Sequence, residues 1–135
     1  MRAARILETA LYVRDVAEAI EFYRDIIGLE PVGKVSARNA FFRCGEGVLL
    51  LFKAEDTLEP PLPGHLPVPS HGTTGPGHVC FAGSRTEIDR WRTHLEQHEV
   101  LIEADFDWPN GARSIYFRDP SGNSLEIAEP RLWDA

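Results

Sequence analysis

The sequence predicts an α+β fold in which two βαβββ modules form a cupped, mixed β-sheet with helices on the outside. Two observations predict it. The order of strand-like and helix-like patterns before residue 55 recurs after residue 77, and the stretch between them is rich in proline and glycine. Each copy is too small to bury a core alone, so we expect the two sheets to join.

We therefore expect one domain over residues 1–135, made of module one (5–54), a connecting loop (55–77) and module two (78–130). The loop holds six of the ten prolines. Proline lacks the backbone N–H that a helix interior or an inner strand needs, so the loop pattern excludes both structures.

Module one begins with a strand pattern over Ile6–Arg14. Asp15 and Glu18 have the spacing of a capping box, which predicts that a helix begins there. Gly28 suits the left-handed position after the helix end. Three strands with short turns are then expected at 30–35, 38–44 and 47–53.

Module two repeats this order. His78–Ala82 is a strand pattern, and Ser84 with Glu87 predicts a second capped helix. Strands are expected at 100–104, 112–118 and 124–128, the last two separated by the turn sequence Asp119–Asn123.

Composition excludes several classes of protein. Fourteen basic against 21 acidic residues give a net charge of −7, which argues against a nucleic-acid partner. The longest apolar run, Val48–Phe52, is too short to cross a membrane, and the N-terminus lacks the pattern of a signal peptide. Cys44 and Cys80 lie in apolar strand patterns, so we expect buried, reduced thiols in a cytoplasmic protein.

Three charged or polar residues interrupt the apolar strand patterns: Glu8, His78 and Glu126. Burying an unpaired carboxylate is costly, so each of these side chains should face a polar pocket, a cation or solvent. Side chains alternate between the two faces of a strand, which places Ser114 and Tyr116 on a face with small or polar residues. Helices would cover the opposite, aliphatic face, leaving this one for a ligand.

Glu8 and His78 open equivalent strands of the two modules, so pseudo-symmetry would bring them close together. One imidazole and two carboxylates, from Glu8, His78 and Glu126, suit one divalent metal ion such as Zn, Ni, Mn, Co or Fe. Three protein ligands leave positions open for substrate. Glu8 or Glu126 could instead serve as a catalytic base, and Arg113 could bind an acidic group of the substrate.

Three stretches carry a resemblance to a known family: Ala17–Tyr23 with Gly28-Leu29, Gly77–Phe81, and above all Phe117–Glu126. With the doubled βαβββ pattern, the chain resembles the vicinal oxygen chelate superfamily, which includes glyoxalase I, fosfomycin-resistance proteins, extradiol dioxygenases and bleomycin-binding proteins. The resemblance carries the metal-ligand positions to Glu8, His78 and Glu126, and the substrate-facing hydroxyls to Ser114 and Tyr116. It also implies a homodimer.

The chain departs from several family patterns. Many members have His where this sequence has Glu8, and no carboxylate stands in Val48–Phe52, where glyoxalase I has a fourth ligand. Ala10 replaces the Thr of thiol-transferring fosfomycin enzymes. Because one His of the two-His, one-carboxylate iron site is missing, we expect a metal-dependent lyase, isomerase or thiol-addition enzyme that chelates a small, oxygen-rich substrate and stabilises an oxyanion. The alternatives are an Fe(II) ring-cleaving dioxygenase and a metal-free protein that sequesters a drug.

Overall fold

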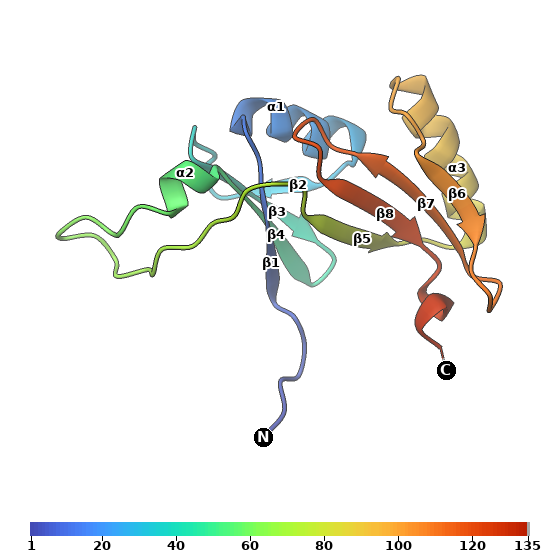
Figure 1. The fold of residues 1–135 in the computed structure, drawn as a ribbon, viewed down its shortest axis with the longest axis horizontal. Helices are drawn as coiled ribbons and strands as arrows, with labels where there is room; N and C mark the ends of the chain where they lie inside the picture. Colours follow the sequence, from blue (N-terminus) through green and yellow to red (C-terminus); the bar gives the residue numbers. More distant parts are fainter. Residues whose placement is uncertain (135) are drawn as a thin grey trace. The chain divides into compact units, whose positions relative to one another are not determined.

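The computed structural model describes residues 1–134 and places them in two compact units that divide between Pro76 and Gly77. Each unit contains one four-stranded mixed sheet (Figure 1). All the strands of a sheet come from the same unit. Each unit has the element order strand–helix–strand–strand–strand. The predicted α+β fold of two βαβββ modules is confirmed.

The first unit has the strand order β1-β4-β3-β2, in which β1 runs parallel to β4 and the other pairs are antiparallel. Its elements are β1 (Glu8–Tyr12), α1 (Val16–Glu21), the π-helical turn η1 (Phe22–Ile26), β2 (Glu30–Val32), β3 (Asn39–Cys44), β4 (Gly47–Phe52) and α2 (Ala54–Thr57).

The first helix starts where the sequence predicts but changes its winding after one and a half turns. Asp15 accepts a hydrogen bond from the Glu18 backbone N–H at 3.1 Å. After Glu21 the chain continues as η1, with the Ile27 N–H bonded to the Phe22 carbonyl. Phe22, Tyr23 and Ile27 are all buried, so the wider turn coincides with the apolar side chains that anchor the helix.

The connecting stretch differs from the prediction at its beginning. Residues 55–57 belong to the short helix α2, although the whole of 55–77 was expected to be non-helical. The first proline of the loop is Pro60, which follows residues 55–57. Proline therefore does not prevent these three residues from being helical. The rest of the loop contains neither helix nor strand.

The second unit has the order β5-β8-β7-β6, with β5 parallel to β8. Its elements are β5 (His78–Ala82), α3 (Arg85–Gln97), β6 (Ala104–Asp107), β7 (Arg113–Arg118), β8 (Ser124–Ala128) and the 3₁₀ turn η2 (Pro130–Trp133). Ser84 and Glu87 form the complete capping box that the sequence predicts.

The strand expected at 100–104 is wrong, because β6 begins only at Ala104. Two of its residues, Asp105 and Asp107, are charged. In the structure both carboxylates are paired with arginines, Asp105 with Arg113 and Asp107 with Arg85. These partners come from β7 and from the start of α3, and local sequence patterns do not reveal them.

The sheet of the second unit has two unlike faces. Its back face packs under α3 (Figure 1), where Ile115, Phe117, Leu125 and Ile127 are fully buried. The front face carries Cys80, which is exposed, and Cys44 of the first unit is half-buried. The prediction of two buried thiols is therefore wrong, because Cys80 alternates onto the same face as His78 and Glu126.

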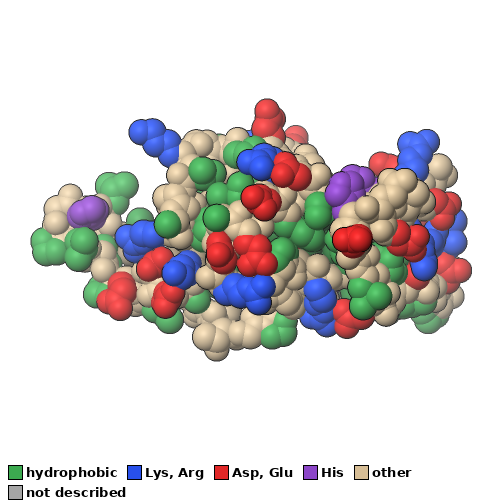
Figure 2. Space-filling view, turned by 90° about the horizontal axis from the view of Figure 1, so that it is seen from above, with side chains coloured by type: hydrophobic (Ala, Val, Ile, Leu, Met, Phe, Trp, Pro, Cys, Tyr) green, Lys and Arg blue, Asp and Glu red, His purple; other side chains and the backbone are tan. Residues whose placement is uncertain are grey.

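No helix among residues 1–134 is long and apolar enough to cross a membrane. Acidic and basic side chains are interspersed on the surface that Figure 2 shows. Apolar side chains of the connecting loop are also exposed, Leu62 and Leu66 most of all.

Candidate metal centre

His78 and Glu126 face each other across the parallel pair β5 and β8. The His78 Nε2 atom lies 3.3 Å from Glu126 Oε1. Glu126 is almost fully buried, with 5% of its surface exposed, whereas the His78 side chain is half-exposed. The pair therefore joins a buried carboxylate to a ring that solvent or a ligand can reach.

The hydrogen bond on the other side of the His78 ring determines which nitrogen is free. His78 Nδ1 lies 2.9 Å from the Ser124 backbone carbonyl, which can only accept, so Nδ1 carries the hydrogen. A neutral ring then presents the Nε2 lone pair to the Glu126 carboxylate. Two electron-pair donors at this distance need a proton or a cation between them, and metal-binding histidines commonly donate their other N–H to a carbonyl in this way.

The second carboxylate oxygen of Glu126 is held by a hydrogen-bond chain. The Ser114 hydroxyl donates to Glu126 Oε2 at 2.6 Å, and Trp108 Nε1–H donates to Ser114 Oγ at 2.8 Å. Ser114 is fully buried. In this unit Ser114 therefore contacts Glu126 and Trp108, and its predicted contact with substrate stays a prediction.

Tyr116 and Cys80 complete the surroundings of Glu126. The pKa of Tyr116 is raised to about 12, mainly by partial burial and secondly by the hydrogen bond and negative charge of Glu126. Its hydroxyl is therefore protonated at neutral pH. The same two causes raise the pKa of the Cys80 thiol to about 12, although the residue as a whole is exposed. The Cys80 thiol is therefore protonated near neutral pH.

Arg113 lies on the other face of β7 from Ser114 and Tyr116. Its guanidinium donates to both oxygens of Asp105 at 2.8 Å and also to Asp89 of α3. These two carboxylates raise the pKa of Arg113. Its predicted role in substrate binding is untested, and in this unit its charge is already balanced by two acids.

Glu8 is an exposed residue at the first position of β1, in the first unit. The structure brings together His78 and Glu126, and residues 1–134 contain no group of three or more His, Cys, Asp or Glu side chains arranged to hold a metal ion. The assignment of Glu8 as the third ligand stays a prediction.

The comparison with known proteins identifies the family. Residues 5–127 match the Glyoxalase/Bleomycin resistance protein/Dioxygenase superfamily. The chain belongs to this superfamily. It is 30% identical over 123 residues to the metallothiol transferase FosB of Staphylococcus haemolyticus, covering 90% of this chain and 81% of that protein. It is 28% identical over 128 residues to the virulence protein STM3117 of Salmonella typhimurium, covering 93% and 83%.

Solved structures of the superfamily extend the match to the whole fold. The crystal structure of lactoylglutathione lyase from Agrobacterium tumefaciens has a TM-score of 0.94 and 42% sequence identity, and the match covers all of both chains. The crystal structure of STM3117 has a TM-score of 0.72 at 27% identity, covering 96% of this chain and 98% of that one.

The turn sequence 107–111 places Trp108 near the rim of the predicted pocket, with stacking on a substrate as one interpretation, but sequence reasoning missed Phe106 as a neighbour of the site. Phe106 stands between two aspartates. The alternation Asp-Phe-Asp could have indicated a strand with one aromatic face, had the arginine partners of the aspartates been known.

Proposed function

We propose that this protein is a metal-dependent enzyme of the thiol-transfer or lyase type that acts on a small, oxygen-rich substrate. The observation that carries the proposal is the pair of electron donors, His78 Nε2 and Glu126 Oε1, facing each other at 3.3 Å. His78 Nδ1 is already bonded to the Ser124 carbonyl, and Glu126 Oε2 accepts from the Ser114 hydroxyl. His78 Nε2 and Glu126 Oε1 are therefore left for a cation.

The donor set fits a divalent transition metal. His78, Glu126 and Glu8 would supply one imidazole and two carboxylates, a combination that suits Zn, Ni, Mn, Co or Fe. Such an ion, when bound, polarises substrate oxygens and stabilises developing negative charge. The protonated hydroxyl of Tyr116 would contact an oxygen of the substrate beside Glu126.

The names of the relatives support the reaction type. One is a metallothiol transferase and another a lactoylglutathione lyase. An Fe(II) dioxygenase site of the facial-triad type needs two histidines and one carboxylate, whereas the proposed set has one histidine. A protein that merely sequesters a drug has no use for two electron donors held face to face.

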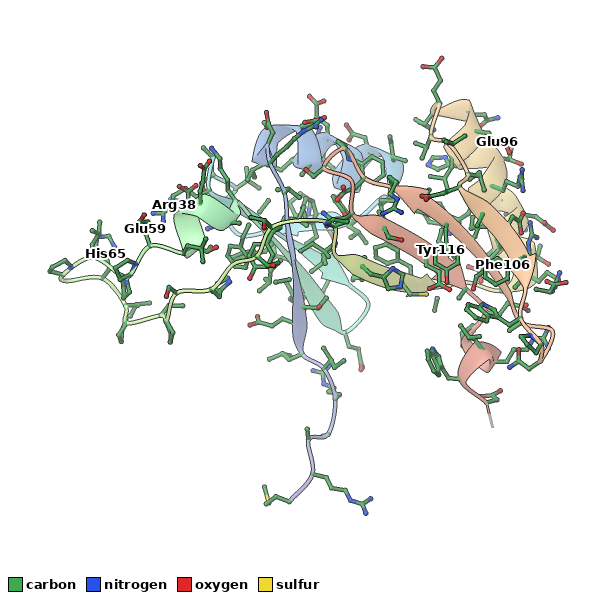
Figure 3. The ribbon with its side chains drawn as sticks, in the orientation of Figure 1. Arg38, Glu59, His65, Glu96, Phe106 and Tyr116 are labelled. Carbon is green, nitrogen blue, oxygen red and sulfur yellow. The ribbon has the colours of Figure 1, made fainter. Side chains whose placement is uncertain are left out.

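The test is a titration of the metal-stripped protein with Ni²⁺, Mn²⁺ and Zn²⁺. Calorimetry measures the affinity, and elemental analysis measures the bound metal per chain. His78→Ala, Glu126→Gln and Glu8→Gln should each lose stoichiometric binding while keeping their circular dichroism spectra. His65→Ala and Glu59→Gln are matched controls on the connecting loop, where Figure 3 labels both residues, and they should bind as the wild type does.

Activity assays on the loaded protein separate the two reaction types. Loss of a thiol in the presence of an epoxide would report thiol transfer, and thioester formation from the methylglyoxal–glutathione hemithioacetal would report lyase activity. A wild type that binds none of the three ions would overturn the proposal and favour a simple ligand-binding role.

We further propose that modules 5–54 and 78–130 form one domain, that the protein is a homodimer, as the family resemblance implies, and that it is cytoplasmic, as its two unpaired cysteines suggest. A single cooperative unfolding transition would support one domain. Light scattering coupled to size-exclusion chromatography would measure the dimer, and a monomer at micromolar concentration would contradict it.

A further inference from the structure

The front face of β6 and β7 carries a wall of parallel aromatic rings. Pairing of Ala104 with Tyr116 and of Phe106 with Ser114 puts the two rings on the same side of neighbouring strands (Figure 3). Their centroids are 5.8 Å apart and their planes differ by 3°. Phe106 keeps 40% of its surface exposed, so a ligand on this face of the sheet can reach its ring.

This aromatic wall leads directly to the candidate metal ligands. The Tyr116 ring stacks at 19° on the His78 ring, with centroids 6.2 Å apart. Phe106, Tyr116 and His78 therefore form a row of nearly parallel rings that ends at the His78–Glu126 pair. The Trp108 ring contacts the Phe106 ring, with centroids 4.9 Å apart.

A cavity of about 250 Å³ lies against this row, lined by Glu103, Ala104, Phe106, Tyr116, Arg118 and Ser124. The two charged residues of the lining neutralise each other, since Arg118 donates to both Glu103 oxygens, at 2.7 and 3.0 Å. Arg118 also donates to the Gly122 carbonyl at 3.1 Å. The cavity consequently offers two aromatic faces and no unbalanced charge.

From this arrangement we infer that the cavity binds a planar, apolar group, such as an aromatic ring, of a substrate whose two adjacent oxygens are held at the His78–Glu126 pair. The inference rests on the proposed metal-dependent function and narrows its substrate class. A flat ring gains contact with Phe106 and Tyr116 in an offset-stacked or edge-on geometry. A small anion would find the charge of Arg118 already balanced by Glu103.

The test compares two chelators that present the same pair of oxygens to a metal, acetohydroxamate and benzohydroxamate. They differ in a methyl against a phenyl group. Calorimetry on the Ni²⁺-loaded protein should show benzohydroxamate binding about tenfold more tightly, after correction for the affinities of the two compounds for free Ni²⁺.

Phe106→Ala should reduce this preference to less than about twofold, while acetohydroxamate affinity stays at the wild-type value. Phe106→Leu keeps an apolar side chain without a ring and should lose most of the preference. Trp133→Ala removes an aromatic side chain that is 87% exposed and should leave the preference unchanged.

Equal corrected affinities for the two hydroxamates would overturn the inference, and so would a preference that survives Phe106→Ala. In either case a wild type that still binds Ni²⁺ and acetohydroxamate would leave the proposed function standing. A wild type that binds no metal would overturn the proposed function, and the inference with it.

Discussion

The Ser114 hydroxyl lies 2.6 Å from Oε2 of Glu126, and it has one hydrogen to give. A carboxylate only accepts, so that hydrogen points at Glu126 and the lone pairs of Ser114 receive the Trp108 N–H at 2.8 Å. These two hydrogen bonds fix the orientation of the nearly buried Glu126 carboxylate. They thereby determine which oxygen, Oε1, faces His78.

Removing the hydroxyl should therefore weaken metal binding without removing a ligand. For Ser114→Ala we expect a loss of about 10–100-fold in Ni²⁺ affinity, the range found when the partners of metal ligands are deleted. Ser114→Thr keeps a hydroxyl and should retain most of the affinity. Calorimetric titration of the metal-stripped variants measures both values.

Trp108→Phe tests the outer member of the chain. It removes the N–H and replaces the indole by a smaller phenyl ring, but Ser114 can still donate to Glu126, so the loss of affinity should be smaller than for Ser114→Ala. Trp133→Phe is the matched control because its ring is exposed. Wild-type affinity in Ser114→Ala would show that the hydroxyl does not position the ligand.

Asp105 should contribute to stability in a manner that depends on pH. Hydrogen bonds from Arg113, with a further contribution from Arg92, lower the pKa of Asp105 from 3.8 to about 2. The folded state therefore binds the proton more weakly than the unfolded chain does. The resulting stabilisation, about 2 kcal/mol, is complete well above pH 4 and is lost as the pH falls through 4 toward 2.

Asp105→Asn measures this contribution. The variant should unfold at lower urea concentration than the wild type at pH 7, and the difference should shrink between pH 5 and pH 3. Asp107→Asn is the control, because its pair with Arg85 is exposed on both sides and should matter far less. A difference that is independent of pH would contradict the assignment.

The two helix starts should differ in their sensitivity to mutation. The Ser84 hydroxyl accepts from the Glu87 N–H at 3.1 Å, and the Glu87 carboxylate accepts from the Ser84 N–H at 2.9 Å. At the first helix only half of the box forms, since the Glu18 carboxylate accepts from Arg14 instead. Ser84→Ala should cost about 1 kcal/mol in the free energy of unfolding.

Chemical denaturation monitored by circular dichroism would measure this cost. Glu87→Ala should lower stability in the same direction, whereas Glu18→Ala should have a smaller effect because Glu18 does not cap the Asp15 N–H. If Ser84→Ala and wild type had the same denaturation midpoint, the hydrogen bonds of the box would be worth no more than those to water.

Much of this arrangement could be predicted from local patterns. The strands His78–Ala82 and Ser124–Ala128 occur as predicted, because their alternation is regular and turn residues bound them. The same alternation correctly placed His78, Glu126 and Tyr116 on one face. Both helix starts were predicted from residues three positions apart, an interaction that is local by nature.

Contacts between residues distant along the chain could not be predicted. The acidic partners of Arg113, Asp89 on α3 and Asp105 on β6, become its neighbours only when the sheet forms, and its role in substrate binding stays a prediction. For Ser114, alternation gives the face of the side chain but not its hydrogen bonds. Only tertiary structure shows that Trp108 and Glu126 enclose it.

The connecting loop is fastened to the sheet of the first unit by His71, and this contact gives the last prediction. His71 Nδ1 lies 2.6 Å from the Tyr12 hydroxyl, and its ring meets the Phe52 ring edge-on at 4.8 Å. The His71 backbone N–H is itself bonded to the Thr57 carbonyl at 2.9 Å.

Tyr12→Phe removes the hydroxyl and keeps the ring. One hydrogen bond is worth about 1 kcal/mol, so hydrogen exchange of the His71 amide should accelerate about fivefold. His65→Ala, an exposed position on the same loop, should not change that rate. An unchanged rate in Tyr12→Phe would show that the ring contacts and the Thr57 bond hold the loop without the hydroxyl.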